Sequence, residues 1–193
     1  MFMGEIVISD HLPNGAGFAN QIHNDWRELL KLILNALPGD GSFAGALISE
    51  VHKDRCDSSC PDCLRHYRNM SYHGLLDWRL GLSLIRILYD STCVCGLDAA
   101  FKYPEIENWE DGARQAQGSF CQTFGCAPLD FGPLPGFNVG NRKVVITHPL
   151  WDPSSPSGLL AEAVASVQDG QLQFVDTFNV QRRMSWAYLA LAM

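Results

Sequence analysis

The sequence predicts an α/β fold, a mixed sheet with packed helices, from three observations. A short β-rich run at 5–9 is followed by a long helical repeat of apolar residues at 18–37. Near the other end, β-rich runs at 142–147 and 172–178 flank an apolar helical segment at 159–167. Strands that alternate with helices favour a sheet covered by helices. The chain has 193 residues, 47% hydrophobic and 18% charged, a globular composition with enough length for a sizeable core.

The first strand ends at Asp10 and leads into a turn rich in glycine. Because the amide groups at the start of a helix point outward unpaired, Asn14, Gly15 and Gly17 could form an anion cradle there. No Gly-Lys-Ser/Thr sequence follows, so this is not a P-loop. The alternative is that the glycines only make the turn and let the strand and helix approach closely.

The next elements lead towards a cluster of cysteines. The helix at 18–37 should stop at the Pro-Gly-Asp-Gly sequence of 38–41. A strand at 46–51 would then deliver the chain to the cluster. After the cluster, a dense apolar run beginning at Leu75 predicts a largely buried helix that ends near Tyr89.

Three cysteines in the middle of this region, Cys56, Cys60 and Cys63, have the spacing C-x3-C-x2-C. An odd number of neighbouring thiols cannot all form disulfides with one another, whereas thiolates at this separation converge readily on one tetrahedral Zn²⁺. Pro61 favours the tight turn that such a site needs. We therefore expect an inserted zinc knuckle at 52–69. The alternative is three free thiols used as small core residues.

A closed structural zinc site needs a fourth ligand, and the spacing alone leaves its identity open. His52, four residues before the first cysteine, is the nearest candidate. The other candidates within reach along the chain are Asp54, His66, His73, Cys93 and Cys95.

A locally basic patch follows the knuckle, where Arg65, Arg68, Asn69 and Arg79 are interspersed with aromatic residues such as Tyr67. This combination suits phosphate contacts and base stacking. The net charge of −7 argues against strong non-specific binding of nucleic acid by the chain as a whole. The alternative is a solvated helix face, with Tyr67 and Trp78 in the core.

The segment 91–140 contains many glycines and prolines and is predicted to be rich in loops, with one helix at 105–117. Cys121 and Cys126 could form a second metal pair or lie in the core. Beyond it, the strand–helix–strand pattern of 142–178 predicts a βαβ unit. An apolar tail at 186–193 ends the chain.

Three sequence blocks carry a resemblance to a known family: LPNGAGFANQI at 12–22, CDSSCPDCLRHYRN at 56–69 and YHGLLDWRLGLSLI at 72–85. They resemble the zinc-binding domain of unknown function at the C-terminus of DEAD/DEAH-box helicases of the MrfA type. HPLWD at 148–152 and FVDTFNVQRR at 174–183 are more similar to the DrmB subunit of DISARM antiphage systems.

The resemblance implies a single helicase-associated domain over 1–193 in which Cys56, Cys60 and Cys63 bind zinc. The repair helicases resemble four-cysteine zinc binders, whereas here no fourth cysteine stands beside the knuckle, which favours His52 or His73. The resemblance also implies a helicase partner and DNA, in antiphage defence or DNA repair. The chain has neither a Walker A motif nor a DEAD/DEAH box, so we expect no ATPase and no catalysis.

Two other functions remain open from the residues. A metal-dependent nuclease or phosphoesterase could use Asp10, His148 and Asp176 at strand ends, with Arg182 and Arg183 on a phosphate. A protein–protein scaffold without nucleic-acid contact could use the apolar tail. The sequence has no signal peptide and no apolar run long enough to span a membrane, so we expect a cytoplasmic protein with reduced thiols and no membrane partner.

Overall fold

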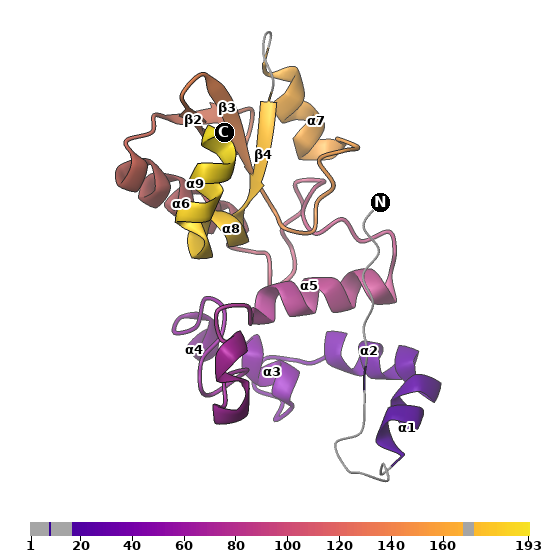
Figure 1. Cartoon of the computed structure of the whole chain (residues 1–193). Helices are drawn as coiled ribbons and strands as arrows, with labels where there is room; N and C mark the ends of the chain where they lie inside the picture. The colour runs from indigo at the N-terminus through magenta and orange to yellow at the C-terminus, as the bar shows by residue number, and fades with distance from the viewer. Residues whose placement is uncertain (1–7, 9–16, 168–171) are drawn as a thin grey trace.

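The structure, a computed structural model, describes residue 8 and residues 17–167 and 172–193 (Figure 1). It has a helical half, residues 17–91, and a sheet half, the described residues from 109 to 193, joined by residues 92–108 (Figure 1). The predicted strand at 5–9, apart from Ile8, and Asp10, Asn14 and Gly15 lie outside the described residues. Among the helices described, none is long and apolar enough to cross a membrane.

The predicted helix at 18–37 is two helices, α1 (Phe18–Asn24) and α2 (Trp26–Leu34). The break lies at Asp25, whose backbone angles of φ −104° and ψ 18° are not helical. Gly17 immediately precedes α1 with φ 78°, a conformation that glycine adopts without strain. Leu30 is the buried residue of α2, which packs against the helix that follows the cysteine cluster.

The predicted strand at 46–51 is wrong, because two short helices occupy this region. They are α3 (Phe43–Leu47) and α4 (Glu50–Lys53). The Ser42 hydroxyl accepts a hydrogen bond from the Gly45 amide, and the Ser49 hydroxyl accepts one from the His52 amide. Each serine therefore caps a helix N-terminus, which favours a helical turn over an extended strand.

The helix after the cysteines, α5 (Trp78–Tyr89), lies on the side of the helical half that faces the sheet half (Figure 1). The Asp77 carboxylate caps it by accepting hydrogen bonds from the amides of Arg79 and Leu80. The expectation of a largely buried helix is only partly right. Trp78 and Leu82 are buried, whereas Leu84 and Leu88 are about two-fifths exposed, at 39% and 41%.

The sheet confirms the predicted fold class, a mixed sheet with packed helices. Its strand order is β1 (Pro128–Phe131), β2 (Leu134–Val139), β3 (Arg142–Thr147) and β4 (Leu172–Asp176). The first two pairings are antiparallel and β3 pairs with β4 in parallel. The helix α7 (Gly158–Ala165) connects β3 and β4, so the predicted βαβ unit is present.

The description of 91–140 as rich in loops is wrong for its second part. Helix α6 (Trp109–Phe124) starts and ends later than predicted, and a β-hairpin follows it. Gly132 makes the hairpin turn with φ 60°. A Cβ at Gly136 would lie 2.1 Å from the Val144 carbonyl oxygen, so this strand position requires glycine. The glycine at this position allows two strands to approach closely, and does not mark a loop.

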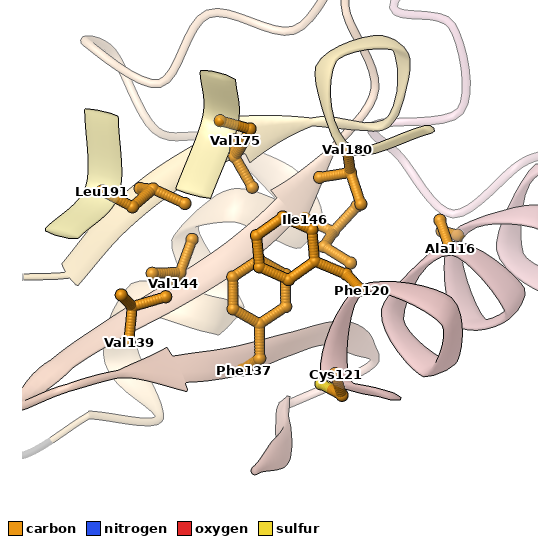
Figure 2. Packing of buried hydrophobic residues seen from close by; sticks show 12 residues of the cluster. Ala116, Phe120, Cys121, Phe137, Val139, Val144, Ile146, Val175, Val180 and Leu191 are labelled. Atoms are coloured by element: carbon orange, nitrogen blue, oxygen red, sulfur yellow. The ribbon is translucent and has the colours of Figure 1, made fainter. Parts of the chain in front are cut away.

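One face of the sheet packs against α6, α8 (Thr177–Arg182) and α9 (Met184–Ala192). Figure 2 shows this core, where the rings of Phe120 and Phe137 stack with centroids 4.3 Å apart. Cys121 belongs to the same apolar cluster, and burial raises the pKa of its thiol, which favours its reading as a core residue. The predicted second strand ends at Asp176, earlier than expected, and the apolar tail forms α9.

Arg182 ties the two halves of the molecule together. Its guanidinium forms an ion pair of 2.8 Å with Asp77, the N-cap of α5. It also donates hydrogen bonds of 3.2 Å to the carbonyl oxygens of Gly74 and Leu76. The side chain suggested from the sequence as a phosphate ligand is therefore engaged in the fold.

Replacing this arginine should weaken the contact between the two halves. We expect Arg182→Gln to lower the free energy of unfolding by about 2 kcal/mol, because the largely buried Asp77 carboxylate loses its cation. Chemical denaturation measures this change. Arg183→Gln removes the same charge from the neighbouring, exposed position and serves as the control. Equal stabilities for the two variants would contradict the proposed clamp.

Candidate metal centre

Four side chains of the knuckle converge on one point. One ligand atom from each of His52, Cys56, Cys60 and Cys63 lies within 4.8 Å of all the others. The sulfur of Cys63 is 3.8 Å from that of Cys56 and 3.6 Å from that of Cys60, whose sulfur is 3.7 Å from Nε2 of His52. Zinc–sulfur bonds of about 2.3 Å at tetrahedral angles place two sulfurs about 3.8 Å apart. The spacing therefore fits one tetrahedral metal ion.

The same distances exclude disulfides within the cluster. A disulfide requires two sulfurs about 2.05 Å apart, and every cysteine among the described residues is a free thiol. The turn between Cys60 and Cys63 is fixed by the backbone. The Cys63 and Arg65 amides both donate to the Cys60 carbonyl oxygen, and the Cys60 amide donates to the Cys63 sulfur at 3.0 Å. This last contact would stabilise a thiolate at Cys63.

The histidine is oriented for ligation by its other ring nitrogen. His52 lies on α4, and its Nδ1 is 2.9 Å from the Leu47 carbonyl oxygen. A carbonyl oxygen only accepts, so Nδ1 carries the proton and the lone pair of Nε2 faces the sulfurs. A backbone carbonyl that fixes the tautomer of a metal-bound histidine is a common feature of zinc sites.

Trp78 joins the cluster to α5. Its indole N–H donates to the Cys56 carbonyl oxygen at 2.9 Å, and its backbone amide donates to the Ser58 carbonyl oxygen at 2.8 Å. Its ring meets the ring of His52 edge-on, with centroids 5.5 Å apart. At 2% exposure Trp78 is buried, so the helix and the ligand loop share one small core.

The protonation state of Cys56 depends on whether a cation is bound. Burial, together with the neighbouring sulfurs of Cys60 and Cys63, raises the pKa of the Cys56 thiol to about 12. Without a cation the thiol form is favoured. A bound metal ion reverses this balance, because a coordinating thiol is deprotonated outright. Three sulfurs and one imidazole make a donor set that can hold such an ion.

The other candidates for the fourth ligand are not in the cluster. The ring of His66 accepts a hydrogen bond from the Arg68 amide, and His73 bonds to the Asn69 side chain at 2.9 Å. The Cys95 sulfur is buried against the Ser83 carbonyl oxygen. Of the residues left open by the sequence, the structure brings His52 to the sulfurs. Those it does not bring there are Asp54, His66, His73, Cys93 and Cys95.

The residues predicted to contact nucleic acid have different surroundings. Asn69 completes a capping box with His66 at the start of η1 (Tyr67–Tyr72). Arg79 donates to the carbonyl oxygens of Asp57 and Pro104, and its guanidinium lies 4.4 Å from the centroid of the Trp78 ring. These contacts give Arg79 a structural role. Arg65 donates to the Ser59 hydroxyl at 2.9 Å. DNA contact by Arg65, Arg68, Asn69 and Arg79 stays a prediction.

The aromatic residues of the patch differ in burial, which the sequence alone did not predict. Trp78 is in the core, whereas Tyr67 is 88% exposed and Tyr72 is 60% exposed, both on η1. Exposed aromatic rings next to arginines are the residue types that stack on nucleic-acid bases.

The polar residues at strand ends make local contacts in what the structure describes. The Asp176 carboxylate caps α8 by accepting from the Asn179 amide at 2.8 Å and from its side chain at 2.7 Å. His148 follows β3, is 3% exposed, and accepts a hydrogen bond from the Leu150 amide at Nδ1. Both residues therefore have local structural roles.

A cleft of about 820 Å³ between the two halves was not anticipated from the sequence. Asp57 and Arg79 line it from the helical half, and Trp109, His148 and Arg182 line it from the sheet half. These residues are up to 125 positions apart in the chain (182 minus 57). No local sequence pattern identifies such a site, because it exists only once the halves are placed against each other.

Comparisons with known proteins give one partial relative. The Druantia protein DruE of Escherichia coli (strain UMEA 4076-1) is 32% identical to the chain over 82 residues. The match covers 42% of the chain and 4% of DruE, so it spans a small part of that protein. No model of a known protein family matches the chain. No solved structure matches it either.

Removing one ligand should remove the metal. We expect Cys60→Ser to reduce metal affinity by about 100-fold or more, because losing a ligand outweighs losing a residue that merely orients one. Elemental analysis of the purified chain measures this loss. Cys93→Ser, outside the cluster, is the matched control and should keep the metal of the native chain. Equal metal content in both variants would contradict the site.

His148 should make stability depend on pH. Burial lowers its pKa from 6.5 to about 4, so the folded chain holds the neutral ring. Its stabilising contribution is therefore complete above about pH 6.5 and is lost as the pH falls towards 4. The full difference is on the order of 3 kcal/mol.

The comparison with His148→Gln isolates this effect from acid release of metal, which both proteins share. Denaturation between pH 7 and pH 4 should show the native chain losing stability faster than the variant. Parallel pH profiles would show that His148 is not held neutral by its burial.

Proposed function

We propose that this chain is a non-catalytic, zinc-stabilised module that partners a DEAD/DEAH-type helicase and contributes to DNA binding, in antiphage defence or DNA repair. The observation that carries the proposal is the convergence of His52 with the sulfurs of Cys56, Cys60 and Cys63. The cluster supports a structural role, because it supplies four protein ligands and so resembles a closed site without an open coordination position.

Zinc is the metal that we propose. Three thiolates and one imidazole at these separations match the ligand types and tetrahedral shape that zinc adopts in structural sites. The free thiols of the chain are consistent with a reducing compartment, and we propose a cytoplasmic location.

The helicase partner and the biological setting are supported by two resemblances. The motif blocks resemble the zinc-binding domain of DEAD/DEAH-box helicases and of the DrmB subunit of DISARM antiphage systems. The 82-residue similarity to the Druantia protein DruE is a second likeness. The chain carries no Walker A motif, so in this proposal the ATPase belongs to another chain or to another part of the same polypeptide.

DNA contact is supported by the surface of η1. The exposed rings of Tyr67 and Tyr72 could stack on bases, and Arg65 and Arg68 lie within two residues of Tyr67 along the chain. The metal would fix the turn from which this surface projects. An acidic chain of net charge −7 would then bind DNA through a local patch, in support of a helicase.

Chelation should loosen the helical half. Because the binding energy of a structural zinc ion is also folding energy, removing zinc should lower the thermal unfolding midpoint and unprotect the amides around 52–69. Hydrogen exchange with and without a chelator measures this change, with the amides of β3 as an internal reference. Unchanged exchange in the knuckle after zinc removal would contradict a structural metal.

Loss of the two arginines before and within η1 should weaken DNA binding. We expect Arg65→Gln with Arg68→Gln to reduce affinity for single-stranded DNA by about tenfold and to flatten its salt dependence, because fewer phosphates are neutralised. Gel shifts at several salt concentrations measure both effects.

The control for this experiment is Arg27→Gln with Arg114→Gln, which changes the net charge equally. These arginines contact Tyr89 and Asp130 and lie outside the knuckle. Equal loss in both double variants would contradict DNA contact at η1, and absence of a gel shift would favour a protein–protein scaffold without nucleic-acid contact. The exposed apolar residues Trp186, Leu189 and Met193 of the C-terminal segment provide one surface for it.

A further inference from the structure

The cleft between the halves has a chemistry that the proposed DNA contact does not use. Its cations are already engaged. Lys53 pairs with Glu50 and Glu107, Arg182 pairs with Asp77, and Arg79 donates to backbone carbonyl oxygens. Among the described cations that line the cleft, Arg79 is the one without an ion-pair partner, and two of its nitrogens already donate to carbonyl oxygens.

The carboxylates at the cleft are in the opposite situation. Asp54, Asp57 and Asp111 are exposed and line the cleft, and none has an ion-pair partner within the described part of the chain. Asp54 and Asp57 belong to the helical half and Asp111 to α6 of the sheet half. Negative charge therefore faces the opening from both sides, which favours a cationic ligand and disfavours nucleic acid.

A second, independent observation comes from two N–H donors. His148, which is only 3% exposed, lines the cleft. Because its Nδ1 accepts from the Leu150 amide, its proton sits on Nε2, which donates to no described residue. The indole nitrogen of Trp109, another lining residue, is buried and also has no partner among the described atoms. Buried polar groups are normally paired, so the buried, unpaired indole N–H of Trp109 favours a ligand or water with acceptor atoms at this cleft, and the Nε2–H of His148 is a second donor there.

The rings that carry these donors are held rigidly. Trp109 stacks on Phe101 with centroids 5.7 Å apart and packs at 4.8 Å against Trp151. Its centroid is 6.1 Å from that of His148. The two donors therefore belong to one group of packed rings. Side chains that are held in place before a ligand binds lower the entropic cost of binding.

We infer that this cleft is a docking site for a basic peptide segment of a partner protein. Backbone carbonyl oxygens of the segment would accept from His148 and Trp109, and its lysine or arginine side chains would pair with Asp54, Asp57 and Asp111. Acidic groups on both sides of the opening suit a ligand with several separated cations, as a peptide has. A volume of about 820 Å³ lies within the range of roughly 300–1,000 Å³ typical of binding sites.

A bound metal would contribute to this site, because Asp54 and Asp57 lie between the ligands His52 and Cys60 in the chain. Metal binding would order the acidic wall of the cleft. The inference goes beyond the proposed contact with DNA and does not depend on it, since that contact uses η1. Failure of one leaves the other intact, and separate assays decide them.

The test begins with a displayed library of random heptapeptides selected on the zinc-loaded full chain. We expect the enriched peptides to carry an excess of lysine and arginine. A synthetic copy of an enriched peptide should bind in fluorescence polarisation, and its binding should shift the indole N–H resonance of Trp109. With Asp54→Asn, Asp57→Asn and Asp111→Asn combined, the dissociation constant should rise by about tenfold or more.

The matched control combines Glu28→Gln, Asp98→Asn and Glu162→Gln, which remove the same charge away from the cleft. It should change the dissociation constant by less than about twofold. Enrichment without basic residues, equal binding to both triple variants, or an unmoved Trp109 resonance would overturn the inference. The resonance in the native chain decides the question even if the cleft variant fails to fold, because it needs no substitution.

Discussion

Three sulfurs and one imidazole held within 4.8 Å of one another form the constraint on which the helical half depends. The helices around them are short, and α4 has only four residues. Segments of this length are not stable alone in water. Four ligands on one ion would join α4 to the turn at Cys60, while the contacts of Trp78 join that turn to α5. A bound metal would thus add to the small apolar core of this half, to which Trp78 and Leu82 belong.

The same constraint determines what the chain presents to partners. The 3-10 helix η1 exposes Tyr67 and Tyr72, whereas Asp54 and Asp57 line the cleft. Arg182 then holds the sheet half against the N-terminus of α5. Under the proposed function, these two surfaces would serve nucleic acid and a partner protein separately.

The sequence predicted those features that depend on local chemistry. The βαβ pattern, the strand at 142–147 and the convergence of three cysteines follow from periodicity and spacing. The errors arose where side chains act on their neighbours or on distant backbone. Ser42 and Ser49 cap helices where a strand was expected, and Gly136 allows close approach within a sheet where a loop was expected. The selection of His52 from six candidates depends on the Leu47 carbonyl oxygen, and the cleft depends on both halves together.

X-ray absorption spectroscopy at the zinc edge, on the chain purified without added metal, tests the central claim most directly. The account predicts one zinc ion per chain with three sulfur ligands at about 2.3 Å and one nitrogen ligand at about 2.0 Å. The His52→Ala variant should lose the nitrogen contribution and keep the sulfur shell, or lose zinc altogether. Absence of zinc, or a shell made only of oxygen and nitrogen, would contradict the account.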